Sequence, residues 1–441
     1  MALSAYIKRF GYCDVELLNG QTPIVPSDQE IVAAVQRFKP DVVGVTTPTL
    51  FFFSVMHICR LIKAALPETK IVLGGPHLTI FAKESVAHPE VDFGVAGEGE
   101  YTFLELLQTL DSGGDLAGVQ SLVWKRDGEV VENAPRVLTE SLDALPMPDF
   151  GLFDLRQHRI PYDDYHPSGV IISSRGCPYQ CSFCSRNYPY YRMRSAGSVV
   201  DEMQAYKDMG YKAVSFYDES FNVSKKRVLE ICRLVQERHL NLPWSFRGRV
   251  DRFDEDTAKA MAAAGCVRAH FGVESGAQEV LDEVCKNISL EQVRDAFRLC
   301  KKYGISTVAF FILGLPRETK QQARRTIDFA LNIDPDYVLY TSLMPMPGSP
   351  IYLEALAAGA FSDYWREFAR NPVPDFAVRT WETGMTEAEI FDLMLEGLAR
   401  FYLRPRYIAR RLRQVKSFED LRAKTEMGLQ LIGRMAKSAL R

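Results

Sequence analysis

The chain has 441 residues, of which 47% are hydrophobic and 25% are charged, and its formal net charge is −3. A chain of this length and composition can bury the cores of two or three domains. The nearly balanced charge does not indicate a polyanion-binding surface, so we expect no nucleic-acid partner. Neither a secretory leader nor an apolar run of about 20 residues is visible, so we expect a soluble, cytoplasmic protein.

Residues 1–132 have the pattern of a doubly wound α/β sheet. Strand signals at residues 14–18, 42–46, 71–74 and 91–95 alternate with helical stretches. The chain opens on the helix-like stretch LSAYIKRFG, so the usual first strand of such a domain is missing. Asp127 and Gly128 stand between alternating apolar residues, which predicts a β-hairpin at the end of this region.

Residues 133–168 are rich in Pro and lack periodicity, so they are predicted to form a linker. Beyond the linker, strand and helix signals alternate, which predicts a partial (βα)6 barrel of the TIM type over residues 169–350. Loops at the carboxyl ends of the strands carry the functional groups in such barrels. The six strand signals begin at Val170, Ala213, Trp244, Val267, Ser306 and Tyr337.

Three cysteines directly after the first barrel strand are the most informative feature of the chain. Cys177, Cys181 and Cys184 have the spacing C-x3-C-x2-C. Cubane iron–sulfur clusters normally take four Cys ligands, so three thiolates would leave one iron open for a small molecule. A structural zinc site is an alternative, but it would need a fourth ligand, and His158 and His166 lack ligand-like spacing. A disulfide is another alternative and would leave one odd thiol.

The Cys triplet, with Phe183 between its last two members, resembles the signature of the radical S-adenosylmethionine (SAM) superfamily. The resemblance implies a [4Fe-4S] cluster on Cys177, Cys181 and Cys184, with SAM on the open iron and Phe183 beside the adenine. It also implies reductive cleavage of SAM to a 5′-deoxyadenosyl radical. The electron would come from a flavodoxin, a ferredoxin or a chemical reductant.

Further segments at strand ends resemble the SAM-holding positions of that family. By this resemblance Asp218 and Glu219 would hold the methionine amino group, Arg249 its carboxylate, Glu274 and Ser275 the ribose, and Gly314 would lie near the adenine. Each position also has a structural interpretation. The acidic pair could cap a helix, Arg249 could form an ion pair, and the Gly-Leu-Pro turn at Gly314 could simply connect a strand to a helix.

The N-terminal region resembles the cobalamin-binding domain that is fused to many radical SAM proteins. Thr46 and Thr47 match its hydroxyl positions, and Gly74 and Gly75 match the glycine pair that approaches the nucleotide tail of the cofactor. The motif D-x-H-x-x-G is absent, so no axial His ligand is expected. Relatives without this His are known to bind cobalamin. The alternative is a degenerate domain kept for packing or substrate binding.

Residues 351–441 are predicted to form a helical C-terminal region. From residue 400 onward it contains twelve Lys and Arg against three acidic residues. A solvated helical face is one interpretation. Peripheral contact with an anionic membrane surface is the other, because apolar residues accompany the basic ones.

The order of these regions resembles a group that includes anaerobic magnesium-protoporphyrin ester cyclase, hopanoid-modifying enzymes and natural-product methyltransferases. We therefore expect a radical SAM enzyme that abstracts hydrogen from an unactivated carbon of a natural product, tetrapyrrole or lipid-like molecule. Methyl transfer would follow if cobalamin binds. The alternatives are cobalamin-independent dehydration, cyclisation or rearrangement, and a non-catalytic iron–sulfur or cobalamin sensor.

Overall fold

A computed structural model of the chain describes residues 1–19, 26–152, 165–185, 188 and 190–413. The chain forms two compact units. The first contains Met1–Ser168, Ser185–Arg194 and Leu356–Ala377, and the second contains Gly169–Cys184, Ser195–Ala355 and Val378–Arg441. Residues 153–164 of the predicted linker and 414–441 of the basic end lie outside the described part. None of the described helices is long and apolar enough to cross a membrane.

The first unit is built on a five-stranded sheet of order β1-β2-β3-β4-β5. Strands β1 (Val42–Thr46), β2 (Lys70–Gly74) and β3 (Phe93–Val95) are parallel. Strand β4 (Leu122–Arg126) returns antiparallel to β3 and pairs with β5 (Glu129–Glu132). The hairpin turns at Asp127 and Gly128, both at positive φ, as the Asp-Gly signal predicted.

Helices surround this sheet, and the predicted strand at residues 14–18 is wrong. That segment follows α1 in the chain and is irregular. It pairs with none of the described strands, so it forms no hydrogen-bond ladder. Its Val15 instead packs beside Tyr6, Ile7 and Leu104. The described residues contain no strand before β1. The unit also contains α1 (Ala2–Lys8), α2 (Asp28–Phe38), α3 (Phe52–Ala65), α4 (Pro76–Ile80), α5 (Ala82–Ala87), α6 (Gly99–Ser112), β8 (Arg192–Met193) and α14 (Tyr364–Arg370).

The second unit is an open sheet of six strands in the order β13-β12-β11-β10-β9-β6. The order does not close β13 onto β6, so the barrel is partial, as predicted. All six predicted barrel strands are present. They are β6 (Ser168–Ile171), β9 (Ala213–Phe216), β10 (Trp244–Gly248), β11 (Cys266–Glu274), β12 (Ser306–Leu313) and β13 (Tyr337–Ser342).

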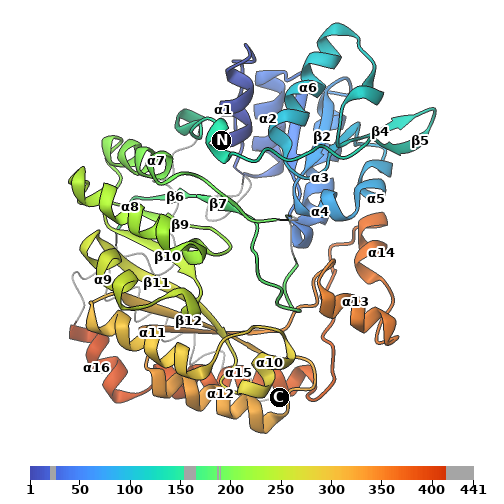
Figure 1. Cartoon of the computed structure of the whole chain (residues 1–441). Coiled ribbons are helices and arrows are strands. Elements are labelled where there is room, and N and C mark those ends of the chain that lie inside the picture. The colour runs from blue at the N-terminus through green and yellow to red at the C-terminus, as the bar shows by residue number, and fades with distance from the viewer. Residues whose placement is uncertain (20–25, 153–164, 186–187, 189, 414–441) are drawn as a thin grey trace. The chain divides into compact units, whose positions relative to one another are not determined.

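Helices cover one face of this sheet, as Figure 1 shows for α8, α9, α11 and α12. Side chains alternate between the two faces of a strand, and alternate residues of the central strands form an aromatic core on the helical side. Phe246 lies 5.9 Å from Phe271, and Phe271 lies 5.7 Å from Phe297 of α11, between ring centroids. The second unit also contains β7 (Ser174–Arg175), α7 (Ala196–Asp208), α8 (Lys225–Glu237), α9 (Glu255–Ala263), α10 (Gln278–Glu283), α11 (Leu290–Lys302), α12 (Lys320–Ile333), α15 (Glu387–Tyr402) and α16 (Pro405–Arg413), and α13 (Pro350–Ala357) begins in it.

Local sequence explains where these helices begin. The hydroxyl groups of Ser224, Ser289 and Thr319 accept hydrogen bonds from the third backbone amide of α8, α11 and α12. At α11 and α12 a Gln side chain reaches back to the capping residue and completes a capping box. Each such cap stabilises its helix by about 1 kcal/mol. The helices therefore start directly after the loops at the carboxyl ends of the strands, and these loops carry the predicted site residues.

Candidate active site

The three cysteines lie on the loop that follows β6 and β7. Cys181 is buried, Cys177 is partly buried and Cys184 is exposed, and none of the three forms a disulfide bond with a described residue. Burial raises the pKa of Cys177, and it raises the pKa of Cys184 to about 11. Both groups are therefore protonated at neutral pH until a metal displaces the proton.

Backbone hydrogen bonds hold this loop against two other loops of the second unit. The amide of Ser182 donates to the carbonyl of Val284, and the carbonyl of Ser182 accepts from the amide of Ile351, both at 3.0 Å. Within the described part of the chain, no three His, Cys, Asp or Glu side chains are grouped closely enough to hold one metal ion.

Arg249 lies buried beside the Cys loop, and its donors are engaged. Its Nε donates to Oδ1 of Asp251 at 2.8 Å, and its Nη2 donates to the carbonyl of Lys286 at 2.7 Å. Its Nη1 lies 3.9 Å from Sγ of Cys181, and its guanidinium carbon lies 3.8 Å from the ring centroid of Tyr179. Arg249 thus joins the Cys loop to the segment around residue 286.

Glu274 ends β11 and forms a buried ion pair with Lys286. Nζ of Lys286 donates to Oε1 of Glu274 at 2.7 Å and lies 5.9 Å from the ring centroid of Phe183. Glu274 has a φ of +68°, which is uncommon for a residue with a side chain. A methyl group at Gly272 would lie 2.3 Å from Oε1 of Glu274, so this glycine makes room for the carboxylate.

Ser275 and Gly276 face α12. Oγ of Ser275 lies 3.1 Å from Oγ1 of Thr326, which also accepts a hydrogen bond from the amide of Gly276 at 2.9 Å. A methyl group at Gly276 would lie 2.5 Å from Cβ of Phe329. Gly272–Gly276 form the segment G-x-E-S-G, and its second half therefore packs the end of β11 against a helix.

Asp218 has its carboxylate fully engaged. Its Oδ1 accepts from the amides of Ser173 and Ser174 at 2.6 and 3.3 Å, and its Oδ2 accepts from their hydroxyl groups at 2.6 and 2.8 Å. Nη2 of Arg227 lies 3.7 Å from Oδ2. The residue is buried, and it anchors the start of the Cys loop.

Glu219, the neighbour of Asp218, is exposed at the end of β9. Partial desolvation of its carboxyl group raises its pKa, and a hydrogen bond from the amide of Gly176 opposes this shift. Because Gly176 directly precedes Cys177, Glu219 places a carboxylate next to the first cysteine. The two acidic residues that the sequence grouped together therefore differ in surroundings.

Gly314 begins the turn after β12, at a φ of +78°. Its amide donates to Oε2 of Glu318 at 2.7 Å, and the amide of Leu315 donates to the same oxygen at 3.3 Å. Oε1 of Glu318 is buried and makes no hydrogen bond with any described residue. Burial raises the pKa of Glu318 to about 7.

The structure thus brings the Cys loop, the end of β10, the end of β11 and the segment around Lys286 into direct contact. Lys286 was missed by the sequence analysis, because no motif marks it. Ser173 and Ser174 were missed for the same reason.

The predicted cobalamin residues lie at the carboxyl ends of β1 and β2 in the first unit. Oγ1 of Thr47 donates to the carbonyl of Gly74 at 2.6 Å and accepts from the amide of Leu78 at 3.2 Å, so this hydroxyl joins β1 to α4. Thr46 is exposed. Gly75 has a φ of +98°, and a methyl group there would lie 3.0 Å from Oγ1 of Thr46. The bare backbone at Gly75 suits a closely approaching ligand at this edge of a parallel sheet.

Comparison with known proteins finds a family match in each of the two α/β regions. Residues 171–330 match the radical SAM superfamily, and residues 1–107 match the B12 binding domain. An uncharacterized methyltransferase of Pyrococcus horikoshii is 31% identical over 402 residues, which are 90% of this chain and 85% of the relative. The chain belongs to the radical SAM superfamily. The enzyme accordingly uses a [4Fe-4S] cluster and SAM, and its B12-binding domain makes cobalamin a candidate third cofactor.

Two further proteins are similar to this enzyme over most of its length. An anaerobic magnesium-protoporphyrin IX monomethyl ester cyclase of Rubrivivax gelatinosus is 29% identical over 424 residues, which are 92% of this chain and 73% of the cyclase. The solved structure of the radical SAM methyltransferase TsrM from Kitasatospora setae, with cobalamin and a [4Fe-4S] cluster bound, has a TM-score of 0.69. It is 23% identical and covers 81% of this chain and 71% of its own, so it supports the fold.

Proposed function

We propose that Cys177, Cys181 and Cys184 hold the [4Fe-4S] cluster and leave its fourth iron to SAM. When bound, the cluster supplies the electron that splits SAM into methionine and a 5′-deoxyadenosyl radical, which takes a hydrogen atom from a carbon of the substrate. The observation that carries this proposal is the buried guanidinium of Arg249, 3.9 Å from Sγ of Cys181. Its positive charge would lie beside the cluster and would offset part of the negative charge of the thiolate ligands.

Some of the site residues would contact SAM, and others would hold those residues in position. Glu219 is the better candidate for the methionine amino group, because the oxygens of Asp218 already accept hydrogen bonds from Ser173 and Ser174. Arg249 acts as a positioning residue, since its donors serve Asp251 and Lys286.

Glu274 would accept the ribose hydroxyl groups. Only its Oε1 is bonded, to Lys286, and Oε2 makes no hydrogen bond with a described residue. Phe183 would flank the adenine, as its place in the Cys motif implies, and Gly314 would present backbone near the same ring. Ser275 would contribute by packing, through its contact with Thr326.

We propose methyl transfer through cobalamin as the overall reaction. The support is the B12 binding match and the extended similarity to a protein named as a methyltransferase. Thr46, Gly74 and Gly75 would face the cofactor, and Thr47 would hold the ends of β1 and α4 in place. Bound cobalamin would supply a methyl carrier, while this unit supplies the surface that orients it.

Radical cyclisation or dehydration without cobalamin is the second candidate. The similarity to the magnesium-protoporphyrin ester cyclase over 92% of this chain favours cyclisation among these reactions. Both candidates need a low-potential electron donor, and we propose a flavodoxin or ferredoxin. Both also take a small-molecule substrate of the natural-product, tetrapyrrole or lipid-like kind.

Anaerobic reconstitution with iron, sulfide and hydroxocobalamin tests the proposal. Iron, cobalt, 5′-deoxyadenosine, methionine and S-adenosylhomocysteine are quantified after reduction with SAM. Cys181→Ala should lose iron and 5′-deoxyadenosine formation, whereas the exposed Cys13→Ala should keep both. A fully loaded wild-type cluster without 5′-deoxyadenosine would refute radical initiation. Full turnover without bound cobalt would favour the second candidate.

Membrane contact through the basic C-terminal region is a further proposal. Ion pairs within the second unit reduce the number of basic residues that are available for it. Arg404 and Arg410 pair with Asp334 at 3.0 and 2.9 Å, and Arg411 lies 3.8 Å from Asp336. These three arginines therefore hold α16 to the barrel and are not available to lipid. The exposed basic and large apolar residues left on α16 for such a contact are Arg406, Ile408, Leu412 and Arg413.

A further inference from the structure

The face of the barrel sheet opposite to the helices carries polar side chains. Oγ of Ser215 on β9 lies 2.8 Å from Oγ of Ser245 on β10, and Nε of Arg268 on β11 donates to Oγ of Ser306 on β12 at 3.0 Å. Side chains two residues apart share a face, so Arg247 and His270 stand on this same face. Arg247 and His270 are paired in the register of β10 and β11.

Arg247 is exposed on this face, next to the last residue of β10. Its guanidinium carbon lies 3.9 Å from the ring centroid of Tyr217, and it makes no hydrogen bond or ion pair with any described residue. The stacking fixes the plane of the guanidinium group and leaves its N–H donors free. Arg249, two residues later, has its donors engaged, so the two arginines differ in role.

The charged side chains that the strands contribute to this face are mainly basic. Across the six strands, all of which are described, the acidic residue is Glu274, which is paired with Lys286. The basic residues of the same strands are Arg247 and Arg268. Burial and these two arginines lower the pKa of His270 to about 3, so His270 is neutral and offers no compensating charge. Among the described residues, the positive charge of Arg247 therefore has no carboxylate partner.

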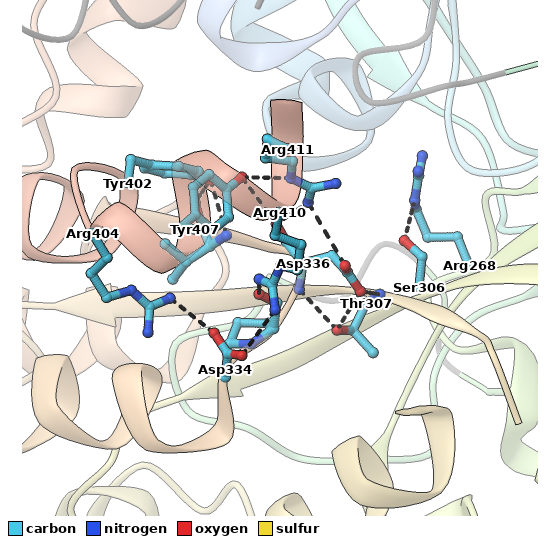
Figure 2. Close-up of polar contacts among 12 residues, drawn as sticks. Arg268, Ser306, Thr307, Asp334, Asp336, Tyr402, Arg404, Tyr407, Arg410 and Arg411 are labelled. Carbon is cyan, nitrogen blue, oxygen red and sulfur yellow. Dashed lines mark hydrogen bonds and ion pairs between the residues drawn. The ribbon is translucent and has the colours of Figure 1, made fainter. Parts of the chain in front are cut away.

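The other end of the barrel is covered, as Figure 2 shows around Asp336 and α16. The hydroxyl group of Tyr407 on α16 donates to the carbonyl of Asp336 at 3.2 Å, directly before β13. The guanidinium carbons of Arg411 on α16 and Arg268 on β11 lie 4.1 and 5.3 Å from the ring centroid of Tyr337. Arg247 lies instead toward the carboxyl ends of the strands, where the Cys loop is found.

We propose that Arg247, held on the ring of Tyr217, binds an anionic group of the substrate, a carboxylate or a phosphate-type oxyanion. The guanidinium fork matches both groups in a bidentate manner. Ser215, Ser245 and neutral His270 would line the neighbouring part of the face and accept or donate hydrogen bonds. This inference rests on the proposed function, because it assigns the substrate of that site an acidic group.

The test is calorimetric titration of the reconstituted, SAM-loaded protein with two probes, inorganic phosphate and succinate. At least one probe should bind the wild type. The probe that binds more tightly identifies the class of anion that the site prefers. Arg247→Met should weaken its binding by about tenfold or more, the loss expected when a charge-assisted hydrogen bond is removed. Arg247→Lys should retain part of the affinity. The matched control Arg298→Met removes an exposed arginine on α11 that pairs with Asp295, and it should bind as the wild type does.

Three results would overturn the inference. They are the absence of binding of either probe by the wild type, equal binding by wild type and Arg247→Met, and a loss of SAM binding in Arg247→Met. The last would assign Arg247 to the SAM carboxylate. The outcome is separate from that of the proposed function, since 5′-deoxyadenosine formation tests radical initiation whether or not the probes bind.

Discussion

At the scale of single residues, the site depends on how buried charges are satisfied. Asp218, Arg249 and Glu274 are all buried, and each has partners that stabilise its charged form. A buried charge without such partners costs several kcal/mol. Glu318 differs from Asp218, because one of its buried oxygens has no hydrogen-bond partner among the described residues.

Glu318 should make the stability of the protein depend on pH. Its pKa is raised from an ordinary 4.5 to about 7. Between these values the folded state holds a proton that the unfolded state has lost, so the free energy of unfolding should fall as pH rises, by up to about 3 kcal/mol. Glu318→Gln should remove most of this decrease, because the amide stays neutral and still accepts from Gly314 and Leu315.

Urea unfolding of the cluster-free protein at about pH 5 and pH 7.5 would measure this effect. Glu354→Gln, which alters an exposed pair with Arg317, serves as the control and should follow the wild type. A parallel change in wild type and Glu318→Gln across this range would contradict the assignment.

Substitution of the two glycines of the G-x-E-S-G segment, Gly272 and Gly276, should have different effects on the protein. Gly272→Ala places a methyl group against the carboxylate of Glu274, so we expect SAM affinity to fall about tenfold. Gly276→Ala places one against Phe329 and the backbone of Thr326, so we expect a loss of stability of about 1–3 kcal/mol. Equilibrium SAM binding and chemical unfolding of both variants would separate these effects. Similar behaviour of the two variants would show that the two glycines do not have separate roles.

At the scale of elements, the strands place the site and the helices support it. The Cys loop follows β6, Glu219 follows β9, Arg249 follows β10, and Glu274 ends β11. Since β9 to β13 pair in parallel within one sheet, their carboxyl ends lie along one edge. Helix α16 covers the opposite end near β12 and β13 and is held there by ion pairs.

Asp334 should control the attachment of α16. Asp334→Asn weakens the pairs with both Arg404 and Arg410, and Asn accepts the φ of +44° at this position, so the backbone should remain unchanged. We expect a loss of about 1 kcal/mol and faster hydrogen exchange in α16. Asp328→Asn, which breaks an exposed pair with Arg400, is the control. Unchanged exchange in Asp334→Asn would mean that apolar packing alone holds the helix.

At the scale of the whole molecule, two compact units carry separate candidate cofactor sites. The Cys triplet belongs to the second unit, and the glycine pair at the end of β2 belongs to the first. The residues proposed for each site belong to a single unit.

Cofactor contents should therefore respond separately to substitution. Gly75→Ala adds a methyl group 3.0 Å from Oγ1 of Thr46 at a φ of +98°, so cobalt content should fall while iron content stays at the wild-type level. Cys181→Ala should do the reverse. Gly113→Ala is the matched control, because it has a φ of +64° with no atom within 4 Å. Metal analysis after reconstitution would measure both contents, and a loss of both metals in Gly75→Ala would contradict independent sites.

The sequence by itself determined the local elements and the class of chemistry. Periodic apolar residues predicted all six barrel strands, Asp127 and Gly128 predicted the hairpin, and the spacing of the three cysteines predicted a cluster site, because these signals act over a few residues. The strand predicted at 14–18 was wrong, since a strand also needs a partner that local sequence does not specify.

Only the tertiary structure decided which charged residues are engaged and which are free. The partners of Asp218 lie 44 and 45 positions away, and Arg249 meets Cys181 across 68 positions. The same folding joined Lys286 to Glu274 and stacked Arg247 on Tyr217, where it has no hydrogen-bond or ion-pair partner among the described residues. Long-range packing sets the surroundings of each charge, and the surroundings determine whether the charge stabilises the fold or remains available to a ligand.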